Sequence, residues 1–267
     1  MSNKETMGKT LTVALLLCIV CSIVVAGSVV ALKPIQQKNK ALNLKANILS
    51  AAGLLESGSN AEKIEADFAA IQPRLVDLET GEYVDPSVVG KTAALDYDQR
   101  KAAKDPELSE AIDGSEDIAN IKRRVRYAKV YVVEQEGQLE TIILPVSGYG
   151  LWSTLHGFLA LEGDANTVVG LGFYEHGETP GLGGEVDNPR WKAIWPGKKV
   201  YNLESSAGPM LRVIKGNVDK TRDDSMYMVD GLSGATLTSR GITNLVQYWT
   251  GEEGFQRYLK RLRRKGA

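Results

Sequence analysis

The chain begins with an uninterrupted apolar run close to its N-terminus. Residues 11–32 contain no charged side chain, and only Thr12, Ser22 and Ser28 are clearly polar. A helix needs about 20 such residues to cross the hydrocarbon core of a bilayer. Small residues at 26–28 would suit a signal-peptide cleavage site, but the apolar region of a signal is only about 7–15 residues long. The pattern predicts one transmembrane helix over 11–32, after a short N-terminal segment, 1–10.

Helical periodicity resumes after the apolar run, and strands follow it. Lys33-Pro34 breaks the pattern, residues 33–58 predict a helical stalk, and 61–68 predicts a second helix. Farther on, apolar and β-branched residues gather in short runs separated by turns. The predicted strands are 128–133, 138–144, 157–161, 168–174 and 226–229. Strands in series with helices at both ends predict one α+β domain over 59–267, with an antiparallel-type sheet flanked by helices.

A charged stretch interrupts this pattern over about 96–126. It mixes acidic and basic residues and ends with Lys122, Arg123, Arg124 and Arg126. Charged side chains are seldom fully buried, so the stretch predicts a surface insertion, with a docking patch as the alternative. The basic run at 257–265 offers a similar choice between a solvated helix end and a contact with lipid headgroups or an acidic subunit.

The last amphipathic helix follows a segment of small residues and hydroxyls. Apolar residues recur with helical spacing at 242, 245, 246 and 249. The segment before them, 230–239, contains two glycines that allow a tight turn and a close approach to a ligand. A helix N-terminus presents N–H groups and a positive dipole end to an anion. The segment predicts a phosphate site with an acceptor hydroxyl or, alternatively, an ordinary N-cap by Ser233, Thr236 or Thr238.

Composition narrows the chemistry further. The chain has 32 basic and 33 acidic residues, a net charge of -1, so nucleic acid is not an expected partner. No G-x-S-x-G, H-E-x-x-H or G-x-G-x-x-G sequence occurs, which argues against hydrolase, metalloprotease and nicotinamide sites. Cys18 and Cys21 lie in the apolar run and are predicted to be apolar fillers. No catalytic residue and no metal site are predicted.

Three segments carry a family resemblance. In chain order they are Gly148-Tyr149-Gly150-Leu151-Trp152, Glu178-Thr179-Pro180-Gly181-Leu182-Gly183-Gly184-Glu185 and Asp230-x-x-Ser233-Gly234-Ala235-Thr236. The last one resembles the flavinylation motif of FMN-binding electron-transfer subunits. With its length and predicted anchor, the chain is similar over essentially its whole length to the C subunit family of the sodium-translocating NADH:quinone oxidoreductase.

The resemblance implies which residues hold the cofactor. Thr236 is the implied acceptor, carrying FMN through a phosphoester to its hydroxyl, with Ser233 and Thr238 as local hydroxyl donors. The backbone of 234–238 is implied to cradle the phosphate, and the loop 178–185 to lie beside the flavin. The full implied set is Tyr149, Trp152, Glu178, Thr179, Gly181, Leu182, Gly183, Ser233, Gly234, Ala235, Thr236, Leu237 and Thr238. Asp230 is left open between binding a metal during attachment and capping the turn.

The resemblance also implies an electron-relay role. Such a protein passes electrons between an iron–sulfur centre in the membrane and the flavin of another subunit, and it is not catalytic alone. The implied partners are the A, B, D, E and F subunits, especially B, D and E, with a flavin transferase during maturation and the lipid bilayer. The implied location is the bacterial inner membrane, single-pass, with a cytoplasmic N-terminus and a periplasmic domain. Lysine counts on the two sides of the apolar run favour neither orientation.

Two other functions fit the same residues. The G subunit of the homologous ferredoxin:NAD (Rnf) electron-transport complex shares the flavin motif. A noncatalytic, membrane-anchored assembly or binding module would use the motif only as a helix cap. The length of the chain and its charged stretch at 96–126 favour the NADH:quinone reductase over the Rnf complex.

Overall fold

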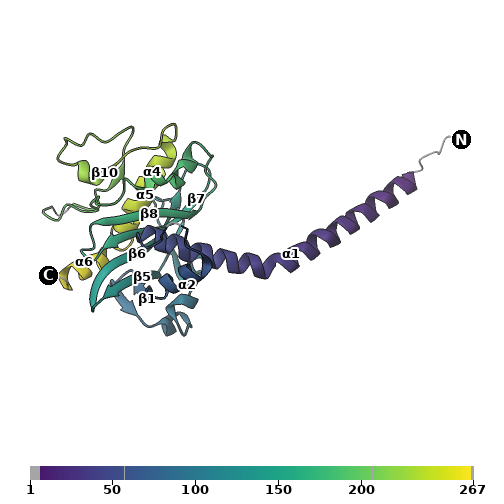
Figure 1. Ribbon diagram of the computed structural model, residues 1–267, viewed down its shortest axis with the longest axis horizontal. Coiled ribbons are helices and arrows are strands. Elements are labelled where there is room, and N and C mark those ends of the chain that lie inside the picture. Colours follow the sequence, from purple (N-terminus) through teal and green to yellow (C-terminus); the bar gives the residue numbers. More distant parts are fainter. Residues whose placement is uncertain (1–6, 57, 206, 266–267) are drawn as a thin grey trace. The chain divides into compact units, whose positions relative to one another are not determined.

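The computed structural model describes residues 7–56, 58–205 and 207–265 (Figure 1). The chain forms two compact units, which divide between Asn43 and Leu44. Helix α1 (Met7–Ala51) contains the whole predicted membrane segment. Among the described residues it is the one helix that is long and apolar enough to cross a bilayer, and its apolar window is not buried against other parts of the chain. Cys18 and Cys21 are both exposed on it.

Pro34 lies inside α1, so the prediction that Lys33-Pro34 interrupts the helix is wrong. A proline inside a helix removes one backbone hydrogen bond and crowds the preceding turn, at a cost of about 3 kcal/mol. Prolines are nevertheless tolerated in membrane-spanning helices, because local adjustments of the helix and neighbouring polar groups satisfy the freed backbone groups. The helix therefore continues to Ala51.

The folded domain begins earlier than the sequence predicted. Its compact unit starts at Leu44, whereas the sequence placed residues 33–58 in a separate stalk. Ile48, Leu49 and Ala51 are almost completely buried. Burying an Ile or Leu side chain contributes roughly 1.5–3 kcal/mol, so the last turns of α1 belong to the core of the domain.

The domain is built on a six-stranded sheet with the order β2-β1-β5-β6-β7-β8, and every neighbouring pair is antiparallel. This confirms the α+β class with an antiparallel sheet. The strands are β1 (Gln72–Asp77), β2 (Glu82–Val84), β5 (Tyr127–Gln135), β6 (Gln138–Tyr149), β7 (Thr154–Glu162) and β8 (Val168–Glu175). Two short pairs lie outside it: β3 (Ser109–Ala111) with β4 (Arg123–Val125), and β9 (Arg212–Val213) with β10 (Met228–Val229).

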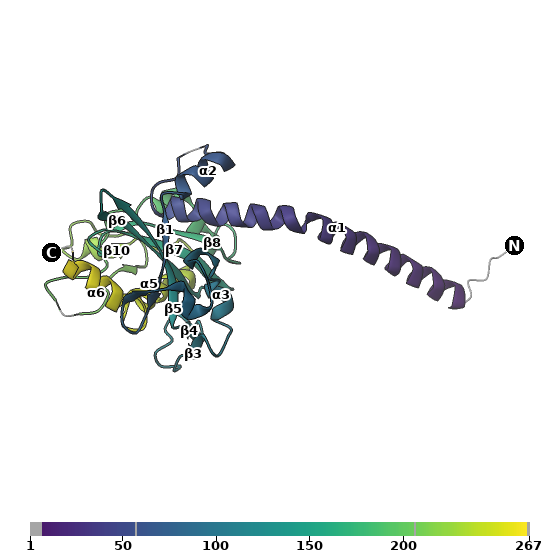
Figure 2. The same cartoon turned by 90° about the horizontal axis from the view of Figure 1, so that it is seen from below.

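Alternation along the strands gives the sheet two apolar faces. Ile142 and Leu144 of β6 join the core that contains Leu245 of α5 (Thr236–Thr250). Ile143 and its cross-strand neighbour Tyr131 point the other way, because successive strand residues face opposite sides. There the Tyr131 ring meets Phe68 of α2 (Ala61–Phe68) edge to face, with ring centroids 6.3 Å apart. Figure 2 shows α2 and the end of α1 on one side of the sheet and α5 on the other.

Three further α-helices and four short 3-10 helices lie in the described part of the domain. The α-helices are α3 (Gln99–Ala102), α4 (Pro189–Lys192) and α6 (Gln256–Lys265). The predicted helix at 61–68 is confirmed as α2, and each of the five predicted strands overlaps an observed one. Strands β1 and β2 were not predicted, because Pro73-Arg74 breaks the alternation of β1 and β2 has only three residues.

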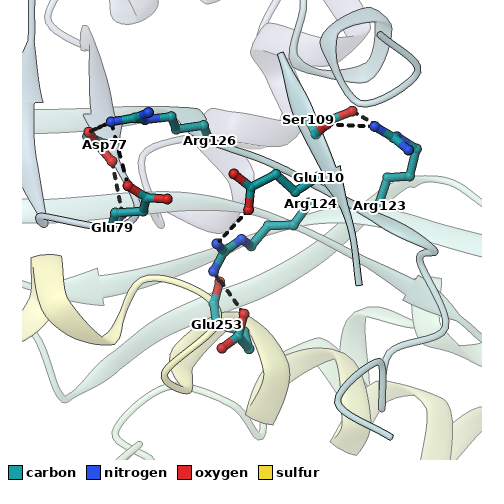
Figure 3. Close-up of polar contacts among 8 residues, drawn as sticks. All are labelled: Asp77, Glu79, Ser109, Glu110, Arg123, Arg124, Arg126 and Glu253. Atoms are coloured by element: carbon teal, nitrogen blue, oxygen red, sulfur yellow. Dashed lines mark hydrogen bonds and ion pairs between the residues drawn. The ribbon is translucent and has the colours of Figure 1, made fainter. Parts of the chain in front are cut away.

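The charged stretch is less solvated than the sequence predicted. Figure 3 shows its arginines pointing to separate parts of the domain. Arg123 donates to Ser109, at 2.9 Å to the hydroxyl and 2.6 Å to the carbonyl. The Arg124 side chain is only 12% exposed and donates to the carboxylate of Glu253 at 2.9 Å. The prediction of a purely solvated insertion is therefore wrong for these two arginines. Arg123 is held by a residue of the same stretch, and Arg124 by a residue far away in the sequence.

Two other basic residues also contact the domain, to different extents. Arg126 lies 3.4 Å from the carboxylate of Asp77 on β1 but remains 47% exposed (Figure 3). In α6, Arg263 donates to the carbonyl of Ala165 at 2.8 Å and lies over the Tyr201 ring, 4.5 Å from its centroid. The C-terminal helix is thus not simply a solvated basic end, since this cation fixes it to the domain.

The contact between α1 and β8 generates a stability prediction. A Cβ atom at Gly170 would lie 2.6 Å from the carbonyl oxygen of Ala51, whereas one at Gly172 would meet nothing within 4 Å. We expect Gly170→Ala to destabilise the domain by about 1–3 kcal/mol through overpacking. Gly172→Ala, the matched control on the same strand, should be neutral or slightly stabilising. Thermal unfolding of the detergent-solubilised chain checks this, and equal melting temperatures for the two variants would contradict it.

Candidate cofactor site

Three segments that are distant in the sequence meet at one buried carboxylate. Glu178, only 5% exposed, follows β8. Its Oε1 atom accepts hydrogen bonds from the backbone amides of Leu151 (3.0 Å), Trp152 (3.0 Å) and Ser153 (3.3 Å). Its Oε2 atom accepts a hydrogen bond from the hydroxyl of Thr238 at 2.7 Å. The carboxylate thus joins the turn after β6, the loop after β8 and the first turn of α5.

These contacts determine the charge of Glu178. Burial acts to raise its pKa, but the hydrogen bonds from Thr238 and the three amides outweigh burial and hold the pKa below the ordinary value of 4.5. The side chain is therefore ionised at neutral pH, and hydrogen bonds to a charged group are roughly twice as strong as neutral ones. The sequence predicted a residue beside the cofactor, whereas this carboxylate points into the protein.

Two glycines make room for the same carboxylate. A Cβ atom at Gly150 would lie 2.6 Å from Oε1 of Glu178. A Cβ atom at Gly183 would lie 2.6 Å from both Oε2 of Glu178 and the hydroxyl of Thr238. The sequence interpreted the glycines of this loop as space for a flat ligand. For Gly183 the observed neighbour is a side chain of the protein itself.

The N-terminus of α5 has no side-chain cap. The N-cap residue is Ala235, so the alternative in which Ser233, Thr236 or Thr238 caps this helix is wrong. The hydroxyl of Ser239 instead accepts a hydrogen bond from the N–H of Leu232 at 3.1 Å, which closes the turn before the helix. Thr236 is exposed as the first helical residue. An exposed hydroxyl therefore lies at the positive end of a 15-residue helix, where an anion is stabilised.

The other predicted polar residues of the site differ in their exposure and in their hydrogen-bond partners. Ser233 is exposed. Thr238 is fully buried, and its hydroxyl donates to Glu178, so it does not face outward as the sequence predicted. Thr179 holds the loop in a tight turn, since its carbonyl accepts from the amides of Leu182 (3.1 Å) and Gly184 (2.9 Å).

Exposed apolar side chains accompany the hydroxyl on the same three segments. Trp152 is 66% exposed and Leu237 is 52% exposed. The set is Tyr149, Leu151, Trp152, Leu182 and Leu237. Leu182 lies against the motif itself, because a Cβ atom at Gly234 would be 3.0 Å from its Cδ2 atom. Apolar surface next to an anion-binding helix end suits a flat aromatic group that carries a phosphate.

Asp230 has hydrogen-bond partners within the protein. Its Oδ1 atom accepts a hydrogen bond from the N–H of Val218 at 2.7 Å, and its carbonyl accepts one from the indole N–H of Trp191 at 2.9 Å. These contacts favour the structural role over a metal ligand for Asp230. Within the described ranges, no group of three or more His, Cys, Asp or Glu side chains is arranged to hold a metal ion.

Sequence reasoning missed two hydroxyls that shape the site. Ser153 accepts a hydrogen bond from the N–H of Gly177 at 2.6 Å, and Ser239 closes the turn before α5. Ser239 ends the segment 230–239 and Ser153 directly follows the segment 148–152, but neither pattern indicates the hydrogen-bond partner of its serine. Only the meeting of the segments around Glu178 gives them a role.

Comparison with known proteins agrees with this geometry. A family model described as "FMN-binding domain" matches residues 150–251. This range includes the second and third segments completely and the first one from Gly150 onward. The chain is 52% identical to the C subunit of the Na(+)-translocating NADH-quinone reductase of Pseudomonas aeruginosa, over 100% of both chains. It is 43% identical to the C subunit of the same enzyme from Yersinia pestis, over 98% of this chain and 95% of that one.

Two crystal structures share the fold. The NqrC of Shewanella oneidensis superposes with a TM-score of 0.74 at 35% identity, covering 86% of this chain and 99% of that chain. The C subunit of the Na(+)-translocating NADH-quinone reductase of Parabacteroides distasonis gives a TM-score of 0.62 at 25% identity, covering 85% and 96%.

The carboxylate at the centre of the site generates a second prediction. Glu178→Ala leaves four donors without their acceptor, and each buried donor left unpaired costs about 1–3 kcal/mol. Glu178→Gln keeps one acceptor oxygen, so we expect a clearly smaller loss of unfolding free energy. Urea denaturation of both variants measures the difference. An alanine variant as stable as the glutamine variant would contradict the bracing role.

The charge of Glu178 also makes the stability of the protein depend on pH. Its folded-state pKa lies below the unfolded value, so its contribution to stability is present above the unfolded pKa and is lost as pH falls through the folded pKa. The stability difference between the wild type and Glu178→Gln should therefore be constant at neutral pH. It should shrink once the pH falls below the ordinary value of 4.5.

Proposed function

Since the chain belongs to the C subunit family of the Na(+)-translocating NADH-quinone reductase, we propose that it relays electrons through an FMN covalently attached to Thr236. It is a subunit of an oxidoreductase complex, and its domain is an FMN-binding domain. The observation that carries the attachment proposal is the exposed Thr236 hydroxyl at the uncapped N-terminus of α5. Relative to free FMN, a phosphoester at this hydroxyl forms with the loss of one water.

Different residues of the chain would hold the phosphate and the ring of FMN. The first-turn amides of α5 would bind the phosphate, with Ser233, Gly234 and Ala235 forming the turn before it. Trp152, Leu182 and Leu237 would offer apolar contact to the ring. Tyr149, Thr179 and Gly181 complete the two turns that carry those side chains. When bound, FMN supplies a carrier of one or two electrons.

Attachment through the phosphate suits a relay. The bond leaves the ring end of the cofactor free to face a partner, and it keeps the flavin in place where free FMN is scarce. The other subunits of the complex are the partners of this chain. We propose that electrons come from an iron–sulfur centre of the membrane subunits and leave to a flavin of another subunit, with B, D and E as the nearest neighbours and A and F in the same assembly. A flavin transferase would attach the cofactor.

The long apolar helix supports attachment to the membrane by a single transmembrane segment. We propose that residues 11–32 of α1 cross the bacterial inner membrane, with residues 1–10 cytoplasmic and the domain periplasmic. The domain contains no cysteine, since Cys18 and Cys21 both lie in the apolar run. A cysteine-free domain suits an oxidising compartment.

Two different observations support the proposed role over its two alternatives. The C subunits of the Na(+)-translocating NADH-quinone reductases compared above match this chain over 95–100% of their own length. That match favours the quinone reductase over the G subunit of the Rnf complex. The uncapped α5 N-terminus disfavours a module in which the motif serves only as a helix cap.

Replacing the acceptor tests the attachment. Thr236→Ala, expressed with the flavin transferase, should lack the added mass of FMN less one water and show no flavin fluorescence in a denaturing gel. Ser233→Ala removes a neighbouring exposed hydroxyl and should keep both signals. Thr236→Ser restores a hydroxyl and should recover them at least in part. If Thr236→Ala retains the flavin, another residue is the acceptor.

Single cysteines test the orientation. With Cys18 and Cys21 replaced by alanine, a cysteine at exposed Glu62 should react with a membrane-impermeant maleimide in intact cells whose outer membrane is permeabilised. A cysteine at position 4 should react only after the inner membrane is broken. The reverse pattern would place the domain in the cytoplasm.

A further inference from the structure

A histidine and an aspartate close the loop that carries Glu178. His176 precedes this loop and Asp187 ends the 3-10 turn Gly183–Asp187 at its far side. The Nε2 atom of His176 lies 2.8 Å from Oδ2 of Asp187. The two residues therefore fasten the ends of the loop to each other. The histidine side chain is only 14% exposed, so its ring is largely enclosed by the protein.

The second ring nitrogen holds the backbone of Glu178. Nδ1 of His176 accepts a hydrogen bond from the N–H of Glu178 at 3.3 Å. With Nδ1 as an acceptor, Nε2 is the ring nitrogen that donates to Asp187. Lys192 lies 3.4 Å from the other oxygen of Asp187 and fixes that carboxylate in turn. The contacts form a chain from Lys192 through Asp187 and His176 to the backbone of Glu178.

We propose that His176, oriented by Asp187, is a positioning residue for the cofactor site and acts through Glu178. This inference rests on the proposed flavin attachment at Thr236. A histidine that holds the Glu178 amide sets where the Glu178 carboxylate meets Leu151–Ser153 and Thr238. It thereby sets the relative positions of the exposed apolar side chains on those segments. The adjacent amide, that of Gly177, is held by Ser153, so Glu178 is the residue of this loop whose amide His176 holds directly.

Substitutions at one position separate the two contacts. In His176→Asn, the amide oxygen occupies a place close to Nδ1 and can still accept from the Glu178 amide, while the contact with Asp187 is lost. In His176→Gln, the longer amide can reach Asp187, but the Nδ1 acceptor is lost. His176→Leu removes both contacts at similar volume. Asp187→Ala leaves the ring in place without its orienting partner.

The test uses the detergent-solubilised full-length chain, purified apart from its partner subunits after flavin attachment, so that its own flavin is the source of the signal. Mass spectrometry measures flavin loading, and visible circular dichroism reports how firmly the ring is held in an asymmetric site. We expect His176→Leu and His176→Gln to lose most of the induced signal per flavin, or to lose loading. His176→Asn should retain both, and Asp187→Ala should lie between these results.

Two results would overturn the inference. One is a wild-type signal and wild-type loading in His176→Leu. The other is an equal loss in His176→Asn and His176→Leu, since general destabilisation rather than the Glu178 amide would then be responsible. Both results differ from failure of the attachment proposal, which would appear as flavin retained by Thr236→Ala or as a wild-type chain without covalent flavin.

Discussion

The buried carboxylate of Glu178 is the constraint on which the site depends. Desolvating a carboxylate is costly unless hydrogen bonds replace its water shell, and here three amides and one hydroxyl do so. Those four donors come from the turn after β6 and from α5, so satisfying one charge requires the fold to bring three segments together. The geometry of the outer surface follows from this inner requirement. The residues that meet a ligand stand on turns whose positions a charge inside the protein has already fixed.

Space for that charge explains why small residues stand where they do. Gly150 and Gly183 leave room for the two carboxylate oxygens, and Gly170 leaves room for the backbone of α1. In each case a methyl group would meet an atom that the fold cannot easily move. The glycines of this domain therefore serve close internal packing at least as much as approach to a ligand. Rigid packing behind the site suits a cofactor that must be held in place for electron transfer rather than transformed.

Much of the fold could be predicted from local pattern. The apolar run, the helices at 61–68 and after 236, and the long strands each repeat a period over enough residues to be recognised. Contacts that depend on distant partners could not be predicted. Arg124 is largely enclosed because Glu253 lies opposite it, and Thr238 is buried because Glu178 accepts its hydroxyl. For the site, the sequence identified the three segments through their resemblance, but not the direction in which Glu178 and Thr238 point.

The end of α1 has a consequence for how this protein can be divided. Ile48 and Leu49 are as deeply buried as any strand residue, although they lie on the helix that holds the apolar run. A soluble fragment cut after the apparent stalk, at residue 59, would lose part of its own interior, whereas one that begins before Leu44 would keep it. The domain therefore includes the last turns of the helix that also carries the apolar run. Recombination that replaced the anchor helix by that of another protein would have to preserve the packing of its last turns on β8, as well as the reading frame.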